Sequence, residues 1–219
     1  PWILNSTMEK NIADIRKDYV KGSMVVSHMP ENPIIAFQQW LNEAIESQVE
    51  EPTAFNLSTI SKEGQPHSRI VLLKGIENDN LVFFTNYKSS KGNDLQFSPK
   101  VALNFFWPEL ERQVRILGNA SPLSPSKSDA YFYSRPIESQ AGAIVSAQSQ
   151  IIEEDTDLAA AIDTLLKKPD AITRPKHWGG YEIEPHYIEF WQGRPSRIHD
   201  RVFYEKTDGL KWKKGRLAP

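Results

Sequence analysis

The sequence contains no cysteine, so disulfides, thiolate metal sites, iron–sulfur clusters and cysteine nucleophiles are excluded together. It has no run of about 18 apolar residues, and we therefore expect no transmembrane helix and no membrane partner. Lysine plus arginine number 26 and aspartate plus glutamate 28, a formal net charge of −2. A charge so close to zero argues against nucleic acid as a partner, although a local basic pocket is compatible with it.

Familiar cofactor and metal motifs are missing too. No G-x-G-x-x-G or G-x-x-x-x-G-K-[ST] loop occurs, so dinucleotide-binding and P-loop folds lose their usual support. No H-E-x-x-H motif or zinc-finger histidine spacing occurs, and we expect no metal. The opening segment PWILNSTMEK has neither the basic start nor the apolar core of a secretory signal, which makes a cytoplasmic location the default expectation.

The hydrophobic pattern predicts antiparallel strands combined with a few helices. Asn32 can cap a helix that begins at Pro33, and further helical patterns cover Gly92–Phe97, Ser124–Pro136 and Asp157–Lys168. Short period-two runs bounded by turn residues predict strands at Ala54–Ile60, Ser68–Ile76, Leu81–Asn86, Val101–Trp107, Gln113–Ala120, Tyr181–Ile183, Tyr187–Trp191, Arg201–Glu205 and Leu210–Lys213. The turns between consecutive strands are too short for parallel crossovers, so we predict a mainly β (α+β) fold: an antiparallel barrel with peripheral helices.

Two basic segments could bind an anion. Arg69 and Lys74 lie near the two ends of a predicted strand, and their odd separation would place them on opposite faces of a regular strand. Such cations are commonly solvated, but an arginine can also grip a phosphate through its planar fork. The segment TNYKSSKG (85–92) brings hydroxyls, Lys88 and Lys91 to the start of a helical link, which suits either a phosphate seat or a plain polar loop.

Two further clusters combine aromatic and polar residues. Tyr131, Arg135 and Ser139 recur at helical spacing, which suits a phosphate site or a core tyrosine beside a surface arginine. Arg197 and His199 alternate along an extended segment and so share a face. Because arginines flank His199, its imidazole suits the role of a neutral hydrogen-bond donor or acceptor, and we predict a functional role for this pair.

Several segments, in this order, resemble the pyridoxine (pyridoxamine) 5′-phosphate oxidase family. The match extends over nearly the whole chain, and W-Q-G-x-P-x-R-x-H-D-R and the terminal RLAP are its most specific parts. The segments are DIRKDYVKG (14–22), RIVLLKG (69–75), FFTNYKSSKG (83–92), ERQVRILG (111–118), YFYSRPIESQAG (131–142), SAQS (146–149), HWGGYEIEPHYIEFWQGRPSRIHDR (177–201) and RLAP (216–219).

The resemblance implies a flavin-binding split β-barrel that assembles as a homodimer with flavin mononucleotide (FMN) sites built from both subunits. It implies one domain over residues 1–219, composed of a substrate lid (1–31), a flavin-binding core (32–125), a helical region that contacts the substrate phosphate (126–177) and C-terminal strands that complete the barrel and the dimer interface (178–219). The implied FMN-binding residues are Arg69, Ile70, Val71, Leu72, Leu73, Lys74, Phe84, Thr85, Ser90, Lys91, Gln113, Gln148, Ser149, Trp191 and Arg201.

The implied activity is oxidation of pyridoxamine or pyridoxine 5′-phosphate by O₂ to pyridoxal 5′-phosphate, with release of H₂O₂ and, from the amine, ammonia, in vitamin B6 biosynthesis. The resemblance places Arg197 and His199 at the reacting end of the substrate as the catalytic residues. The implied substrate-binding residues are Arg16, Lys17, Asp18, Tyr19, Lys74, Tyr131, Arg135, Ser139, Arg197, Ile198 and His199.

The chain departs from the family pattern at three positions. Ser90 stands where the family usually has an arginine, which removes one charge expected near the flavin phosphate, and Lys88 is a candidate to compensate. Ile144 replaces a frequent aromatic residue and Ile198 a usual leucine. Two other functions remain open: a split-barrel flavin reductase with another substrate, and a pyridoxal phosphate carrier without turnover.

Overall fold

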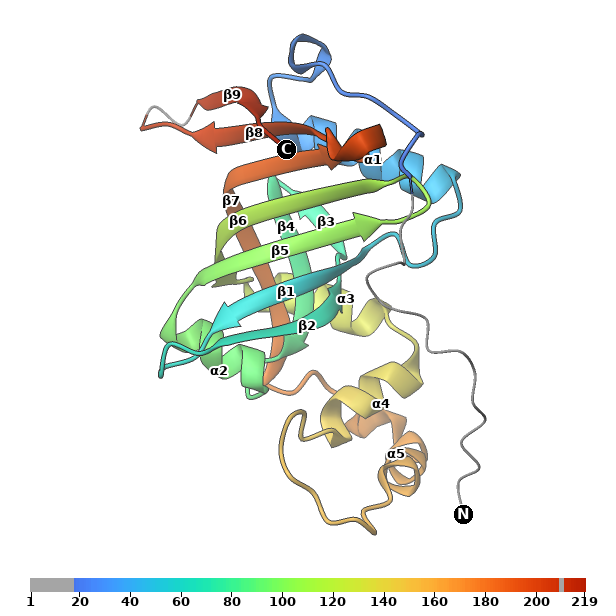
Figure 1. Ribbon diagram of the computed structural model, residues 1–219. Coiled ribbons are helices and arrows are strands. Elements are labelled where there is room, and N and C mark those ends of the chain that lie inside the picture. Colours follow the sequence, from blue (N-terminus) through green and yellow to red (C-terminus); the bar gives the residue numbers. More distant parts are fainter. Residues whose placement is uncertain (1–17, 209–210) are drawn as a thin grey trace, which may run out of the picture.

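A curled antiparallel sheet organises the chain in the computed structural model, which describes residues 18–208 and 211–219 (Figure 1). Within those residues the main path of the sheet runs β2-β1-β5-β6-β7-β4-β3, and β8 and β9 extend it from β7. The strands are β1 (Ala54–Ile60), β2 (Pro66–Leu72), β3 (Gly75–Glu77), β4 (Asn80–Asn86), β5 (Lys100–Trp107), β6 (Arg112–Pro122), β7 (Trp178–Gln192), β8 (Asp200–Lys206) and β9 (Trp212–Leu217).

Helices lie around this sheet, with α4 and α5 at the end opposite to β8 and β9 and α3 between them and the strands (Figure 1). No helix in the described ranges is long and apolar enough to cross a membrane. The helices are α1 (Pro33–Glu46), α2 (Ser90–Phe97), α3 (Pro125–Ser134), α4 (Ile137–Val145) and α5 (Leu158–Leu166), with short 3₁₀ turns at Val26–His28, Pro169–Ala171 and Pro195–Arg197.

The long strand β7 connects the main path of the sheet to β8 and β9. One edge pairs with β6 from Tyr181 to Gln192, and the other edge pairs first with β4 and then with β8. The register of β6 and β7 shifts between Leu117 and Gly118. A Cβ atom on Gly118 would lie 2.6 Å from the carbonyl oxygen of Glu184, so glycine permits the close approach of the two strands here. β7 thereby fixes the relative positions of β4, β6 and β8 in the split barrel.

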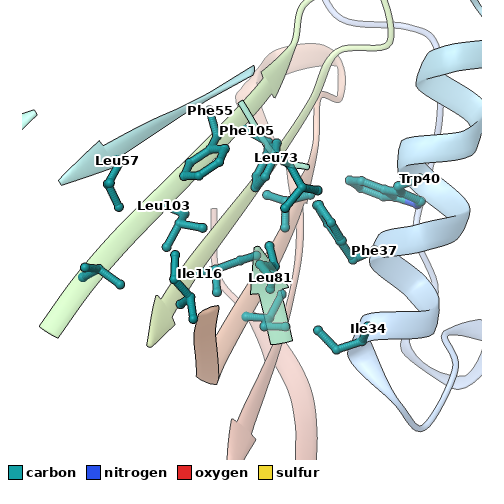
Figure 2. Close-up of a cluster of buried hydrophobic side chains, with 14 of the residues drawn as sticks. Ile34, Phe37, Trp40, Phe55, Leu57, Leu73, Leu81, Leu103, Phe105 and Ile116 are labelled. Carbon is teal, nitrogen blue, oxygen red and sulfur yellow. The ribbon is translucent and has the colours of Figure 1, made fainter. Parts of the chain in front are cut away.

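Helix α1 covers the core of the barrel. The side chain of Asn32 accepts a hydrogen bond from the backbone N–H of Ile34 and caps the helix, as the sequence predicts. Phe37 packs 4.9 Å from Phe105 between ring centroids, and Trp40 packs edge-on against the ring of Phe190. Figure 2 shows Ile34, Phe37 and Trp40 on the side of the helix that faces the sheet.

The predicted fold class is confirmed, and several boundaries differ from the sequence prediction. The strand expected over Leu210–Lys213 is β9, Trp212–Leu217, and Leu210 lies outside the described residues. The strand expected over Ser68–Ile76 is interrupted, since β2 ends at Leu72 and β3 begins at Gly75. The two strands expected between residues 181 and 191 are one strand, β7. The helix expected to reach Pro136 ends at Ser134, and α4 follows that proline, which cannot donate a helical hydrogen bond.

Two neighbouring isoleucines of α1 test the contribution of this core. Ile34 is 1% exposed and Ile35 is 47% exposed. We expect Ile34→Ala to lower the free energy of unfolding by about 2–5 kcal/mol, because it leaves a cavity, and Ile35→Ala to change it by less than about 0.5 kcal/mol. Denaturant unfolding at one fixed protein concentration measures both variants. Equal losses would show that α1 is not packed as described.

Candidate functional site

A cavity of about 730 Å³ opens between β2, β4, α2, the α3–α4 junction and the start of β7. It gathers most of the residues that the sequence predicts to bind flavin or the substrate phosphate. Leu73 is an exception, because its side chain lies in the hydrophobic core. The predicted residues that line the cavity are Arg69, Ile70, Val71, Leu72, Lys74, Phe84, Thr85, Ser90, Lys91, Tyr131, Arg135, Ser139, Gln148 and Ser149.

Arg69 and Lys74 line the same cavity, contrary to the expectation that they face opposite ways. That expectation assumes a regular strand over both residues, and β2 ends at Leu72. Lys74 therefore does not follow the alternation of the strand. The interruption between β2 and β3 thus allows the side chains of Arg69 and Lys74 to line the same cavity.

Three aromatic rings form a stack beside this cavity. Tyr131 lies 3.8 Å from Phe84 between ring centroids, and its ring plane is within 5° of that of Trp178 at 6.2 Å. The guanidinium of Arg135 lies 4.7 Å from the centroid of Trp178, and its buried Nη1 atom has no hydrogen-bond partner in the part of the chain that the structure describes. Burial raises the pKa of Tyr131 and lowers that of Arg135. A buried cationic donor without a partner is suited to receive an anionic ligand.

Lys91 is a second buried cation in the cavity. It is 6% exposed, and its ammonium donates to Thr85 Oγ1 at 3.2 Å and to Ser89 Oγ at 3.3 Å. Burial, with a smaller effect of the nearby charge of Arg69, lowers the pKa of Lys91 from 10.5 to about 8. An anion in the cavity would raise the pKa of Lys91 again, because its negative charge would offset both the burial of the ammonium and the repulsion by Arg69.

Sequence reasoning missed three residues that line the cavity: Asn86, Pro136 and Trp178. Trp178 belongs to the H-W-G-G-Y segment that carries the family resemblance, but the sequence alone gives it no role. Its contact with Arg135 crosses from β7 to the residue after α3, so only the folded chain reveals it.

The remaining predicted residues form a second cluster near the other end of β7. Gln113 pairs with Trp191, and Trp191 pairs with Arg201, so the three side chains share one face of the sheet. The Nε atom of Arg201 donates to Glu189 Oε1 at 2.8 Å, and this hydrogen bond raises the pKa of the guanidinium. The carboxylate thus fixes the orientation of Arg201.

The catalytic candidates lie beside this second cluster. The ring of His199 lies 4.6 Å from that of Trp191 and 5.8 Å from that of Tyr19. Its Nδ1 atom accepts a hydrogen bond from the backbone N–H of Arg194, so a neutral ring carries its proton on Nε2. Arg197 is exposed and has a positive φ of 59°, an uncommon conformation for a non-glycine residue.

The residues predicted to form an N-terminal lid are only partly described by the structure. Tyr19 packs on Trp191 and His199, and a Cβ atom on Gly193 would lie 2.7 Å from Tyr19 Cγ. Asp18 is exposed, as is Ile198. Arg16 and Lys17 lie outside the described residues.

The single chain thus contains two separate groups of predicted site residues. Trp178 lines the cavity and Trp191 lies in the second cluster, near opposite ends of β7 and roughly 40 Å apart along a regular strand. Figure 1 shows the helical end of the molecule and the β8–β9 end on opposite sides of the sheet. One chain alone therefore does not unite the cavity with the catalytic candidates.

Comparisons with known proteins identify the class to which this fold and cavity belong. The family model described as pyridoxamine 5′-phosphate oxidase matches residues 41–167, and a model described as the C-terminal dimerisation region of pyridoxine 5′-phosphate oxidase matches residues 178–219. The fold is the split barrel of flavin-binding proteins. The chain belongs to the pyridoxamine 5′-phosphate oxidase family.

Individual relatives agree with this assignment. The chain is 51% identical to a pyridoxine/pyridoxamine 5′-phosphate oxidase of Chromobacterium violaceum and 48% identical to one of Cytophaga hutchinsonii, each match covering 97% of this chain and 100% of the relative. Among solved structures, PhzG from Burkholderia lata, in complex with tetrahydrophenazine-1-carboxylic acid, has a TM-score of 0.84 at 32% identity and covers 89% of this chain and 96% of its own. An FMN-binding protein of Nostoc punctiforme shares the fold, with a TM-score of 0.70 at 19% identity, over 87% of this chain and 100% of that chain.

The lowered pKa of Lys91 has a measurable consequence for the ligand-free protein. Its pKa is about 8 in the folded chain and near its ordinary 10.5 in the unfolded chain, so the unfolded state binds more protons between these values. We therefore expect the free energy of unfolding to rise from pH 8 to pH 10 more steeply in the wild type than in Lys91→Met. Denaturant titrations across this range measure the difference. Lys88→Met, which removes an exposed lysine, is the control and should follow the wild type; parallel profiles for Lys91→Met would contradict the assignment.

Proposed function

We propose that this protein is an FMN-dependent oxidase that converts pyridoxamine or pyridoxine 5′-phosphate to pyridoxal 5′-phosphate. The observation that carries the proposal is the cavity, which gathers two sets of anion-binding side chains around one aromatic stack. Family membership and the names of the relatives at 48–51% identity support the same activity. The enzyme would be an oxidoreductase of vitamin B6 biosynthesis with O₂ as acceptor.

The residues of the cavity fit an FMN molecule. Arg69 and Lys91 offer cationic donors for its phosphate, and Ser90 offers a hydroxyl in place of the arginine that is usual in the family. Lys91 has no carboxylate partner among the described residues. Its positive charge is therefore available to a dianionic phosphate. The remaining proposed contacts on this chain come from Ile70, Val71, Leu72, Lys74, Phe84, Thr85, Gln148 and Ser149, all of which line the cavity, whereas Leu73 packs in the core.

We infer that a second copy of the chain completes the site. Gln113, Trp191 and Arg201 lie on the outer face of the sheet, in the same row as Phe106, which is 50% exposed. Neighbouring positions on this face add Ile70, which is 63% exposed. They also add the buried side-chain oxygens of Asn56 and Asn104, which have no hydrogen-bond partner within residues 18–208 and 211–219.

Exposed apolar side chains and unpaired polar atoms on one face are typical of a surface that another subunit covers. Covering it with a second copy would bring the Trp191 cluster of one subunit to the cavity of the other. The matched C-terminal dimerisation region, residues 178–219, contains Trp191 and Arg201 and supports this arrangement.

The substrate would be held through its phosphate. Lys74, Tyr131, Arg135 and Ser139 offer two cations and two hydroxyls among the residues that line the cavity. The unpaired Nη1 of Arg135 provides a charge-assisted donor that is already oriented by Trp178. Binding energy at this remote phosphate can position the pyridine ring for reaction.

The reacting carbon, C4′, would lie beside Arg197 and His199 of the second subunit. His199 can donate a hydrogen bond from Nε2 to a ring substituent, because Nδ1 is occupied by the backbone of Arg194. Arg197 is exposed and charged and can position the amine or alcohol on C4′. Tyr19, packed on His199, can cover the bound ring, as could Arg16, Lys17, Asp18 and Ile198. When bound, FMN would supply the redox chemistry between C4′ and O₂, with H₂O₂ as the reduced product, while the residues named here would hold and orient the substrate.

Two arginine variants separate chemistry from phosphate binding. In air, with FMN and pyridoxamine 5′-phosphate, the wild type should form aldehyde, H₂O₂ and ammonia. We expect Arg197→Met to retain FMN but to lower kcat/KM about ten- to a hundredfold, because it loses a charged contact at the reacting carbon. Arg135→Met should chiefly raise KM, because it removes a contact to the remote phosphate.

The same assay distinguishes the alternatives. A wild type that binds FMN and pyridoxal 5′-phosphate without turnover would make the protein a carrier. Turnover of another electron acceptor or aromatic acid, without aldehyde formation, would make it a reductase or an oxidase of different specificity. Loss of FMN in Arg197→Met, or normal turnover by that variant, would contradict the role given to Arg197.

A further inference from the structure

A buried carboxylate lies directly behind the cations of the cavity. Asp94, on α2, is 6% exposed and belongs neither to the cavity lining nor to the predicted site. Its Oδ2 atom accepts a hydrogen bond from Thr59 Oγ1 at 2.6 Å, contacts His67 Nδ1 at 3.0 Å, and lies 3.7 Å from Arg69 Nη2. Asp94 therefore joins α2, which carries Ser90 and Lys91, to β1 and β2.

The same group holds one end of the Arg69 guanidinium. Nη1 of Arg69 donates to Thr59 Oγ1 at 2.7 Å, to the carbonyl oxygen of Leu57 at 3.0 Å and to that of His67 at 3.3 Å. Protein acceptors thus occupy Nη1, and Nη2 faces the Asp94 carboxylate at 3.7 Å. Nε has no hydrogen-bond partner among the described residues and, with the second hydrogen of Nη2, can serve a ligand. Thr59 donates its hydroxyl proton to Asp94 and can receive Arg69 only on its oxygen. Asp94 therefore orients the hydroxyl of Thr59, and this hydroxyl in turn orients the guanidinium of Arg69.

Simple electrostatics predicts an unfavourable effect of Asp94 on an anionic ligand. A negative charge this close to Arg69 offsets part of the attraction for a phosphate. A long arginine side chain without an anchor, however, must lose its rotamer freedom when it binds a ligand, and a preorganised one has already lost it. The contacts with Asp94 and Thr59 thus orient the Arg69 guanidinium at the cost of a lower net positive charge near the ligand.

We propose that Asp94, acting through Thr59, is a positioning residue that presents Arg69 to the phosphate of FMN. This inference rests on the proposed function, which places that phosphate at Arg69 and Lys91. Ser90 brings no charge where the family usually has an arginine, so the phosphate depends more heavily on these two cations. Asp94 does not touch the ligand; its contribution passes through the arginine.

Flavins with and without a phosphate provide the test. We expect Asp94→Asn to raise the Kd for FMN about tenfold, because it loosens a charge-assisted contact, and to leave the Kd for riboflavin unchanged. Thr59→Val, which removes the hydroxyl at nearly constant volume, should act in the same direction. Quenching of flavin fluorescence measures the Kd of each flavin for the wild type and for each variant. Asp163→Asn, which removes an exposed carboxylate of α5, is the control for charge.

A double-mutant cycle separates positioning from a general structural role. In an Arg69→Lys background, Asp94→Asn should add little to the Kd for FMN, since the guanidinium it orients is gone. Tighter or unchanged FMN binding in both Asp94→Asn and Thr59→Val, or equal losses for FMN and riboflavin, would overturn the inference while leaving the proposed function intact. A wild type that binds riboflavin as tightly as FMN would overturn the phosphate placement in the proposed function and this inference with it.

Discussion

The structure depends on one strand with three partners. β7 pairs with β6 from Tyr181 to its end, with β4 through its first residues and with β8 through its last, so the positions of β4, β6 and β8 all depend on it. The cavity residue Trp178 lies at its beginning, and Trp191, beside the catalytic candidate His199, lies near its end. Because a paired β-strand is rigid along its length, these two groups have a fixed separation. The chain cannot fold them onto each other without breaking the sheet.

The fixed separation along β7 explains why the predicted site residues of one chain lie in two separate places. The cavity provides anion-binding side chains and an aromatic stack, and the outer face of the sheet provides Gln113, Trp191 and Arg201 in register. In the proposed homodimer each subunit contributes a different part to each of two equivalent sites, as expected for a symmetric, self-complementary interface. Dimerisation would then be a condition for catalysis rather than a source of stability alone.

The sequence predicts the fold class and most of the cavity well, because the signals involved are local. Turn residues mark the strands, Asn32 and Pro33 mark the start of α1, and the family motifs identify the polar residues of the cavity. Three features escape it. The break after Leu72, which turns Lys74 into the cavity of Arg69, depends on how β3 pairs with β4. The roles of Trp178 and Asp94 depend on contacts between distant elements. Which residues share one chain's site, and which need a second copy, follows only from the geometry of β7.

The most direct test of the shared site is complementation between two inactive variants. Arg69→Ala damages the cavity and Arg197→Met damages the second cluster, so each homodimer contains only defective sites. Refolding the two chains together in equal amounts should restore about a quarter of the wild-type oxidase activity, because half of the dimers are mixed and each mixed dimer has one intact site. Activity that stays at the level of the separate variants, in a sample shown to contain mixed dimers, would place the whole site within one chain and contradict the account.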